Sequence, residues 1–456
     1  METPTLEFDR GTLLLRGVSA DQAPEAFVDD PRVDAFRAPG FTYRDGFAEL
    51  HRQFGTRLND TARDYHEVEL TVRDNRRPFE HQREALRAWH AGGRRGVVVL
   101  PTGSGKTFVA ELAMAKVGRS SLIVVPTLDL MNQWYSRLLT AFRLDEVGLV
   151  GGGYYDVKPV TVTTYDSFSL QAEQLGNRFG LLVFDECHHL PSTTYSAAAE
   201  CYIAPFRLGL TATPERQDEL LSIYEGPVGP IVYRAEIKEL AGSHLSEYET
   251  RTIQVELNKE ERERYTTARE TYLGFLRQSG VRLGGRGGWS QFIAMASRTR
   301  WGRKALAAYR EQKRIALTCQ EKMRVVELLL ARHQTDRTII FTSDNETVYQ
   351  LSQHFLVPAI THQTRIKERQ DILDGLKSGR FRAVATSKVL NEGVDIPSAS
   401  VAIVLSGSGS VREHVQRLGR ILRRQEGKQA TLYEVLASDT MESSVSERRR
   451  DHDAYR

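Results

Sequence analysis

A glycine-rich run directly after a short apolar stretch constrains this chain more than any other feature. Residues 97–100 are Val-Val-Val-Leu, and residues 101–107 read Pro-Thr-Gly-Ser-Gly-Lys-Thr. This order predicts a buried strand, a turn and a helix start, which together surround an anion with backbone N–H groups. Lys106 would place a positive charge at the outer phosphates of a nucleotide, and the Thr107 hydroxyl is placed to bind Mg²⁺. The loop residues expected to line the phosphates are Thr102, Gly103, Ser104 and Gly105.

The chain is therefore expected to bind and hydrolyse a nucleoside triphosphate. The alternative is a glycine-rich turn that connects a strand to a helix and binds nothing. Gly, Lys and Thr at these offsets favour the nucleotide interpretation.

The composition is that of a globular protein with more than one core. The chain has 456 residues, of which 40% are hydrophobic and 27% are charged, and two to four domains are expected. Its apolar runs are too short to span a membrane, and the first residues do not form a signal peptide. Three cysteines without paired spacing favour a reduced, cytoplasmic setting. The net charge of +3 gives no overall basic field, so any contact with nucleic acid has to be local.

Two segments alternate strands with helical stretches. Residues 76–240 and 321–456 both show this rhythm, which predicts parallel sheets covered by helices, an α/β fold. Residues 1–75 mix short apolar runs with turn residues and predict a small mixed domain. The strands expected in the two α/β segments are 97–100, 122–125, 160–163, 181–184, 207–210, 338–341, 383–386, 402–405 and 430–435.

Residues 241–320 differ from their surroundings and predict a helical hairpin inserted between the α/β segments or into one of them. Asn258 followed by Glu261 forms a capping box at the start of one helix. A glycine-rich break at 284–288 separates it from a second helical stretch. The apolar face expected on the first helix consists of Tyr265, Ala268, Tyr272 and Phe275.

Two acids follow the predicted strand at 181–184. Asp185 is expected to hold Mg²⁺, and Glu186 to orient or deprotonate the attacking water. His188 is expected to link these acids to the neighbouring strand end by a hydrogen bond. A zinc site at residues 187–189 is disfavoured, because three adjacent residues do not converge readily on one tetrahedral ion.

Further polar residues follow other strands or precede the loop. Thr211 and Thr213, at one strand end, can touch both the acids and a moving element; the alternative is a threonine-rich strand end without function. Gln82 offers one donor and one acceptor to the edge of adenine, and a surface glutamine is an equal alternative.

The last segment carries a basic helical motif. Gln416, Arg420 and Arg423 share one helix face, and arginines aimed at a γ-phosphate stabilise the transition state when two domains close. A solvated basic helix is the alternative. Upstream, Gly393 and Asp395 predict a hinge and a contact to ribose or to an arginine.

The ordered set of motifs resembles that of superfamily-2 helicases. This resemblance implies two RecA-like lobes, ATP in the cleft between them and nucleic acid across both. The motifs that carry it are residues 101–107, 126–127, 163–165, 185–188, 211–213, 340–342, 391–395 and 416–423.

Within that superfamily the chain resembles the XPB-type DNA helicases, in their compact archaeal and bacterial form. The family implies a damage-recognition-like domain at 1–75, a helical thumb at 241–320 and a charged Arg-Glu-Asp motif after the first lobe. Here that motif reads Arg216-Gln217-Asp218, so Gln217 stands where the family has an acid. The segments that carry the closer resemblance are 41–45, 175–179, 204–209 and 406–410.

We therefore expect an ATP- and Mg²⁺-dependent DNA translocase of 3′→5′ polarity that acts in DNA repair. Thr127 and Thr164 are expected to grip backbone phosphates, and Arg216 and Asp218 to take part in coupling to DNA. A nuclease partner is compatible with this activity, and no membrane partner is expected. The alternatives are an RNA helicase of the DExH type, a restriction motor, and a clamp that binds ATP without turnover.

Overall fold

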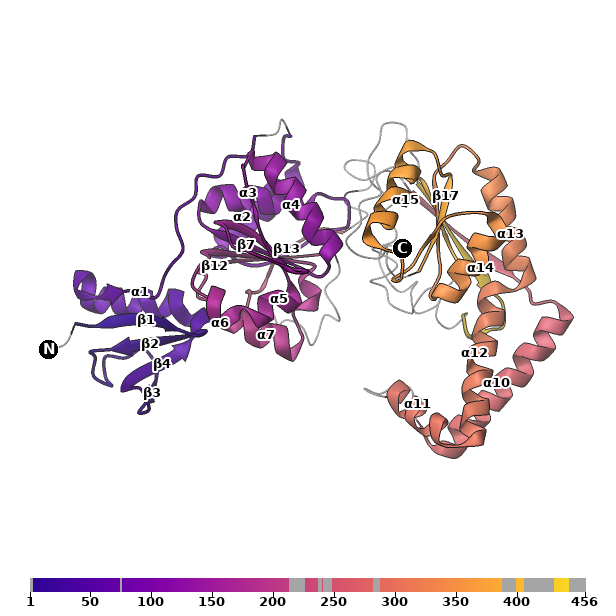
Figure 1. Ribbon diagram of the computed structural model, residues 1–456, viewed down its shortest axis with the longest axis horizontal. Helices are drawn as coiled ribbons and strands as arrows, with labels where there is room; N and C mark the ends of the chain where they lie inside the picture. Colours follow the sequence, from indigo (N-terminus) through magenta and orange to yellow (C-terminus); the bar gives the residue numbers. More distant parts are fainter. Residues whose placement is uncertain are drawn as a thin grey trace. The chain divides into compact units, whose positions relative to one another are not determined.

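The computed structural model of the chain describes residues 3–73, 76–212, 226–236, 240, 248–281, 288–387, 399–405 and 430–442. It divides into two compact units, Met1–Leu240 and Ala241–Arg456 (Figure 1). A small mixed sheet precedes two larger sheets built from parallel strands, and a helical region lies between the larger sheets in sequence. This arrangement confirms the predicted α/β class. No described helix is both long and apolar enough to cross a bilayer.

The N-terminal sheet orders its strands β3-β4-β2-β1-β5. Only the β1–β5 pair is parallel, and helix α1 (Tyr43–Phe54) follows β4 after a short 3₁₀ turn, η1 (Gly40–Thr42). A core of apolar side chains includes Leu13, Leu15 and Leu50. The strands are β1 (Thr5–Asp9), β2 (Thr12–Arg16), β3 (Val28–Asp30), β4 (Ala35–Pro39) and β5 (Asn59–Asp60).

This small sheet packs directly on the first lobe, which is the α/β part of the first unit (residues 76–240). Ile203 of the lobe belongs to the same buried cluster as the sheet residues. Glycines occur where the two surfaces approach most closely: a Cβ on Gly40 would lie 2.6 Å from the Cys201 carbonyl oxygen, and one on Gly11 would lie 2.7 Å from the Cys201 Cβ. Because neither position has room for a side chain, the contact depends on both glycines.

The first lobe contains an eight-stranded sheet in the order β13-β6-β12-β11-β7-β10-β8-β9. Every neighbouring pair is parallel except β8–β9. The strands are β6 (Arg95–Val99), β7 (Ser121–Val125), β8 (Gly148–Gly151), β9 (Tyr154–Asp156), β10 (Val160–Thr164), β11 (Leu181–Asp185), β12 (Phe206–Thr211) and β13 (Ile231–Arg234).

Helices cover both faces of this sheet, as predicted. Figure 1 shows α2, α3 and α4 on one side and α5, α6 and α7 on the other. The helices are α2 (Glu80–Ala91), α3 (Lys106–Val117), α4 (Leu128–Phe142), α5 (Tyr165–Leu170), α6 (Ala172–Leu175) and α7 (Thr193–Glu200).

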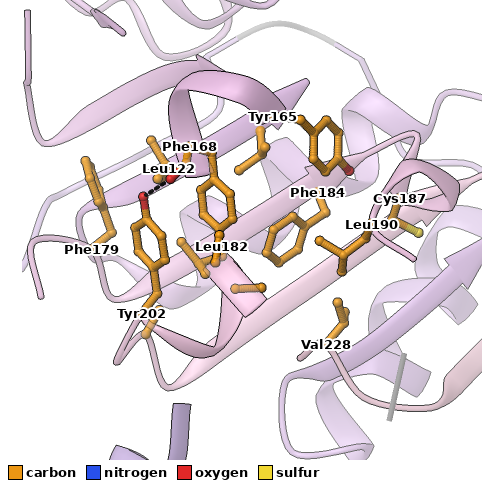
Figure 2. Packing of buried hydrophobic residues seen from close by; sticks show 14 of the residues in the cluster. Leu122, Tyr165, Phe168, Phe179, Leu182, Phe184, Cys187, Leu190, Tyr202 and Val228 are labelled. Atoms are coloured by element: carbon orange, nitrogen blue, oxygen red, sulfur yellow. Dashed lines mark hydrogen bonds between the residues drawn. The ribbon is translucent and has the colours of Figure 1, made fainter. Parts of the chain in front are cut away.

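The core of the first lobe extends from the sheet to the segment that follows the acidic pair (Figure 2). The rings of Phe168 and Tyr202 stack with centroids 4.3 Å apart, and the Tyr202 hydroxyl donates to the Phe168 carbonyl at 3.0 Å. Cys187 and Leu190, just after the acids, are fully buried in the same cluster. The acids are therefore attached to rigid core on both sides.

The described part of the second unit contains six strands in the order β14-β19-β18-β15-β17-β16, all parallel. One of them corrects the sequence analysis: β14 lies inside the range 241–320, which was predicted to be helical, and pairs along its full length with β19. The helical part therefore begins later, at Lys259. The strands are β14 (Tyr248–Val255), β15 (Thr338–Phe341), β16 (Ala359–Ile360), β17 (Ala383–Thr386), β18 (Val401–Val404) and β19 (Ala430–Ala437).

Among the residues that the structure describes, the predicted helical region contains three helices: α10 (Lys259–Ser279), α11 (Gly288–Arg298) and α12 (Arg300–Thr318). The capping box is confirmed, since Asn258 accepts from the Glu261 N–H and Glu261 accepts from the Asn258 N–H. The four apolar residues predicted for one face of α10 are buried. Helices α13 (Gln320–Arg332), α14 (Asn345–Phe355) and α15 (Ile366–Ser378) accompany the sheet.

Candidate nucleotide and nucleic-acid site

The glycine-rich loop connects β6 to α3 and curls because two of its glycines have positive φ. Gly103 and Gly105 both have φ of 87°, a conformation that other residues rarely adopt. A Cβ on Gly105 would also lie 2.3 Å from the Gln82 Nε2 atom. The loop therefore needs glycine at 105 for its backbone and for its close contact with α2.

The loop is held in shape by its own polar groups. The Lys106 ammonium donates to the Leu100 carbonyl at 3.2 Å, and the Ser104 hydroxyl donates to the Pro101 carbonyl at 2.7 Å. The Thr102 Oγ1 atom is buried and has no hydrogen-bond partner among the described residues. An unsatisfied buried hydroxyl in a loop with positive-φ glycines fits a loop that receives an anion.

Gln82, predicted to contact adenine or to be a surface residue, is buried against the loop. Its Oε1 atom accepts from the Phe79 N–H at 3.0 Å, and its Nε2 atom donates to the Ser104 carbonyl at 2.8 Å. The His81 Nε2 atom lies 2.9 Å from the same carbonyl oxygen. The surface interpretation is thus wrong, and the adenine contact remains a prediction.

Asp185 ends β11, in the core next to the loop. Its Oδ2 atom accepts from the Trp134 Nε1–H at 2.8 Å, and its Oδ1 atom accepts from the Glu186 N–H at 3.0 Å. Burial, and then the charge of Glu186, raise the pKa of Asp185 to about 6, while the charge of Lys106 opposes this shift. The electrostatic effect of Lys106 on Asp185 indicates that loop and acid share one site. Asp185 together with the half-buried Thr107 offers the oxygen ligands that Mg²⁺ prefers.

Glu186 has φ of 47°, in the left-handed region that a non-glycine residue seldom occupies. Its Oε2 atom lies 3.4 Å from His188 Nδ1, and that nitrogen lies 3.2 Å from Thr211 Oγ1. His188 thus connects the end of β11 to the end of β12, which is the hydrogen bond expected from the sequence.

Thr127 and Thr164 both cap helices at the carboxyl edge of the sheet. Thr127 precedes α4 and accepts from the Leu130 N–H, and Thr164 precedes α5 and accepts from the Ser167 N–H, each at 3.3 Å. The strands before them, β7 and β10, are neighbours. The two hydroxyls therefore belong to one side of the sheet, adjacent to the strand end that carries Asp185.

A second polar cluster, at the carboxyl edge of the other sheet, was missed by the sequence analysis. Ser387 follows β17 and donates to the Asn345 Oδ1 atom at 2.9 Å, while Asn345 Nδ2 lies 2.7 Å from His362 Nδ1. These residues follow three different strands, and that placement is the signal that could have identified them.

Eight predicted site residues lie outside the described residues, and their roles remain predictions. They are Thr213, Arg216, Asp218, Gly393, Asp395, Gln416, Arg420 and Arg423.

Three family descriptions match successive parts of the chain. Residues 6–76 match the Xeroderma pigmentosum group B helicase damage recognition domain. Residues 75–216 match the res subunit of type III restriction enzymes, and residues 298–453 match the ERCC3/RAD25/XPB C-terminal helicase.

Curated relatives match most of the chain. DNA 3′-5′ translocase XPB2 of Sulfurisphaera tokodaii is 39% identical over 431 residues, which cover 92% of this chain and 97% of that protein. DNA 3′-5′ helicase XPB of Mycobacterium tuberculosis is 31% identical over 384 residues, which cover 81% of this chain and 62% of that protein. The chain thus spans nearly all of the first relative and less than two thirds of the second.

Solved structures share the fold. The helicase domain of Hef from Pyrococcus furiosus matches with a TM-score of 0.52 at 18% identity, over 80% of this chain and 96% of that one. Dbp5 of Saccharomyces cerevisiae, bound to RNA and ADP BeF3, matches with a TM-score of 0.53 at 14% identity, over 83% and 89% of the two chains. At these identities the likeness concerns the fold alone.

Proposed function

The chain belongs to the XPB family of superfamily-2 DNA helicases and translocases, and on this basis we propose that it is an ATP-driven motor that moves 3′→5′ along DNA during DNA repair. The observation that carries the ATPase is the meeting of two sequence-distant groups in one place. Strand β6, which leads into the loop that ends at Lys106, and strand β11, which ends at Asp185, both pair in parallel with β12, so the loop and the acid pair lie at the same edge of one sheet.

In this proposal the loop binds the phosphates and the acids serve hydrolysis. Lys106 exchanges its bond to the Leu100 carbonyl for the outer phosphates, and Thr107 and Asp185 hold Mg²⁺. The metal neutralises charge on the phosphates when bound. Glu186 orients and deprotonates the attacking water. Its contact with His188 transmits structural changes at the nucleotide site to the end of β12.

The second unit is proposed to complete the site. Arg420 and Arg423, with Gln416, would stabilise transition-state charge on the γ-phosphate, and Gly393 and Asp395 would contribute a hinge and a ribose contact. These roles rest on the sequence pattern and on membership of the family.

Contacts to DNA are proposed on both units. Thr127 and Thr164 would hold backbone phosphates on the first lobe, and the cluster of Asn345, His362 and Ser387 would do so on the second. The residues proposed to couple hydrolysis to this grip are His188, Thr211, Thr213, Arg216 and Asp218. A nuclease partner and a cytoplasmic location complete the proposal, and copurification with a nuclease activity would test the former.

ATP hydrolysis by the wild type, Lys106→Ala and Glu186→Gln tests the proposal, each measured without nucleic acid and with single-stranded DNA, duplex DNA or RNA. We expect stimulation of the wild type by DNA, loss of turnover in both variants, and retention of ATP binding in Glu186→Gln. Stimulation by RNA alone would favour an RNA helicase. Binding of ATP by the wild type without turnover under any condition would favour a non-enzymatic clamp.

A further inference from the structure

A tight hairpin at the edge of the first-lobe sheet carries two exposed tyrosines. Strand β8 pairs with β9 so that Gly151 lies opposite Tyr154. The two residues between them, Gly152 and Gly153, have φ of 61° and 93°, and a two-residue hairpin turn of type I′ requires positive φ at both positions. Tyr154 therefore follows the turn at once and is held by the strand ladder.

The hairpin turn lies at the edge that carries the proposed phosphate contacts. Strand β8 is parallel to β10, so both end at the same side of the sheet. A Cβ on Gly151 would lie 3.2 Å from the Thr164 Oγ1 atom, and one on Gly152 would lie 2.7 Å from Leu128 Cδ2. Leu128 directly follows Thr127 in the chain. The end of β8 and the turn after it therefore lie close to Thr164 and to the residue that follows Thr127.

The two tyrosines differ in how they are held. Tyr155 is 57% exposed, and its hydroxyl donates to the Gln174 Oε1 atom at 3.2 Å, which fastens the hairpin to α6. Tyr154 is 61% exposed, and its side chain forms no hydrogen bond or ring contact with any described residue. Of the two exposed rings, Tyr154 is thus the one that no described residue holds, and it lies beside the proposed phosphate contacts.

We propose that Tyr154 is a stacking platform for an unpaired base of the bound DNA strand. This inference rests on the proposed DNA-translocating function and adds to it a contact with a base rather than with phosphate. The face of an aromatic ring stacks on any base, so the contact would be independent of sequence. It requires a base that is free of its partner, and therefore single-stranded DNA or a strand junction at this place.

Two observations favour a base over a protein strand or a phosphate as the occupant. Strand β9 has only three residues, and so short an edge is a poor template for strand addition. Lys158, the basic residue that follows the hairpin two positions after β9, lies 2.9 Å from the Glu146 carboxylate and 3.8 Å from that of Asp156. The hairpin therefore offers the Tyr154 ring for stacking, while the Lys158 ammonium is already paired with two carboxylates.

The test compares the full-length wild type with Tyr154→Ala, with Tyr154→Phe, which keeps the ring, and with Leu170→Ala. Leu170 is 80% exposed on the same lobe and serves as the matched control for loss of an exposed apolar side chain. Dissociation constants are measured at several salt concentrations for labelled oligo(dT), for a strand of equal length built from abasic sites, and for a paired duplex. Melting temperatures verify that each variant is folded.

For Tyr154→Ala we expect oligo(dT) binding roughly 5- to 150-fold weaker, the range that stacking on one base supplies. Binding to the abasic strand and to the duplex should not change, and Tyr154→Phe and Leu170→Ala should bind like the wild type. The slope of log Kd against log salt should stay the same, because no phosphate contact is lost.

An unchanged affinity of Tyr154→Ala for oligo(dT) would overturn the inference, as would an equal loss on the abasic strand or a smaller salt slope. These results are distinguishable from failure of the proposed function itself. If the wild type bound no DNA and its ATPase did not respond to DNA, the motor proposal would fail as well.

Discussion

Asp185 and Glu186 are adjacent in sequence but are constrained in different ways. Asp185 sits at the end of a buried strand with both carboxylate oxygens accepting hydrogen bonds. Glu186 occupies the left-handed backbone region, at a cost of order 1 kcal/mol or more. This conformation turns the chain sharply after β11, and the two carboxylates have different described partners: Trp134 and the Glu186 N–H for Asp185, and His188 for Glu186.

The raised pKa of Asp185 predicts how stability depends on pH. Burial, followed by the charge of Glu186, raises this pKa from 3.8 to about 6. Between about pH 4 and pH 6 the unfolded chain releases this proton while the folded chain keeps it, so the contribution to stability falls as pH rises. Asp185→Asn cannot titrate. In metal-free buffer, the melting temperature of the wild type minus that of the variant should therefore decrease from about pH 4 to about pH 7. A constant difference across this range would contradict the prediction.

Among the elements, helix α3 is fixed to its surroundings by a buried carboxylate. Glu111 is fully buried and forms ion pairs with Arg76, in the segment that follows the N-terminal sheet, and with Arg137 of α4. The Arg76 guanidinium also lies 3.9 Å from the centre of the Phe108 ring. The helix that begins with Lys106 is thus tied to two other segments of the chain.

Glu111→Ala should destabilise the first unit by about 2 kcal/mol, because it removes the buried carboxylate that accepts hydrogen bonds from two charged arginines, which are themselves partly exposed to water. The variant Glu80→Ala is the matched control: Glu80 pairs with Arg83 and Arg87 at the surface, where water screens the charges, so its loss should change stability much less. Denaturant unfolding followed by tryptophan fluorescence measures both. Equal losses in the two variants would show that burial of the pair contributes nothing.

Elements with a strong local pattern were predictable from sequence, and elements that depend on distant pairing were not. The nine strands predicted for the lobes are present, because apolar runs bounded by turns mark buried strands on their own. Strands β8 and β9 were missed because glycines surround them and resemble a loop. Strand β14 was missed because it contains exposed, charged residues and precedes a helical segment in the sequence. Its strand conformation depends on pairing with β19, far along the chain.

The residues of the candidate site show the same distinction between local patterns and distant contacts. The loop at 101–107 and the acids at 185–186 are contiguous motifs, so sequence alone located them. Glu111 and Tyr154 acquire their surroundings from residues far along the chain, or from the edge of a sheet, and no local pattern marks either. The roles assigned to the site residues remain predictions.

At the scale of the whole molecule, the N-terminal sheet and the first lobe form one compact unit. Their contact centres on Cys201, which faces two glycines of the small sheet with no space for a side chain between them. Burial raises the pKa of the Cys201 thiol, so both access and ionisation limit its reactivity.

Gly40→Ala should loosen this contact, since its Cβ would lie 2.6 Å from the Cys201 carbonyl oxygen. We expect the Cys201 thiol to react several-fold faster with a disulfide reagent, while the buried thiols of Cys187 and Cys319 keep their rates. Gly274→Ala, where a Cβ would find its nearest neighbour at 3.9 Å, is the control and should leave the Cys201 rate unchanged. An unaltered rate in Gly40→Ala would show that the contact tolerates a side chain there.

The pairing of β14 with β19 affects the order in which the protein can fold during its synthesis on the ribosome. The first unit is built from one continuous stretch, Met1–Leu240, and a nascent chain can complete it early in synthesis. Strand β14 is made soon afterwards, but its neighbour among the strands that the structure describes is β19, whose eight residues run from Ala430 to Ala437. Throughout the synthesis of the helical region and the rest of the second sheet, β14 exposes both of its edges. The sheet of the second unit can therefore be completed only after this late strand has been made. A chaperone that protects exposed strand edges would be needed longest at β14.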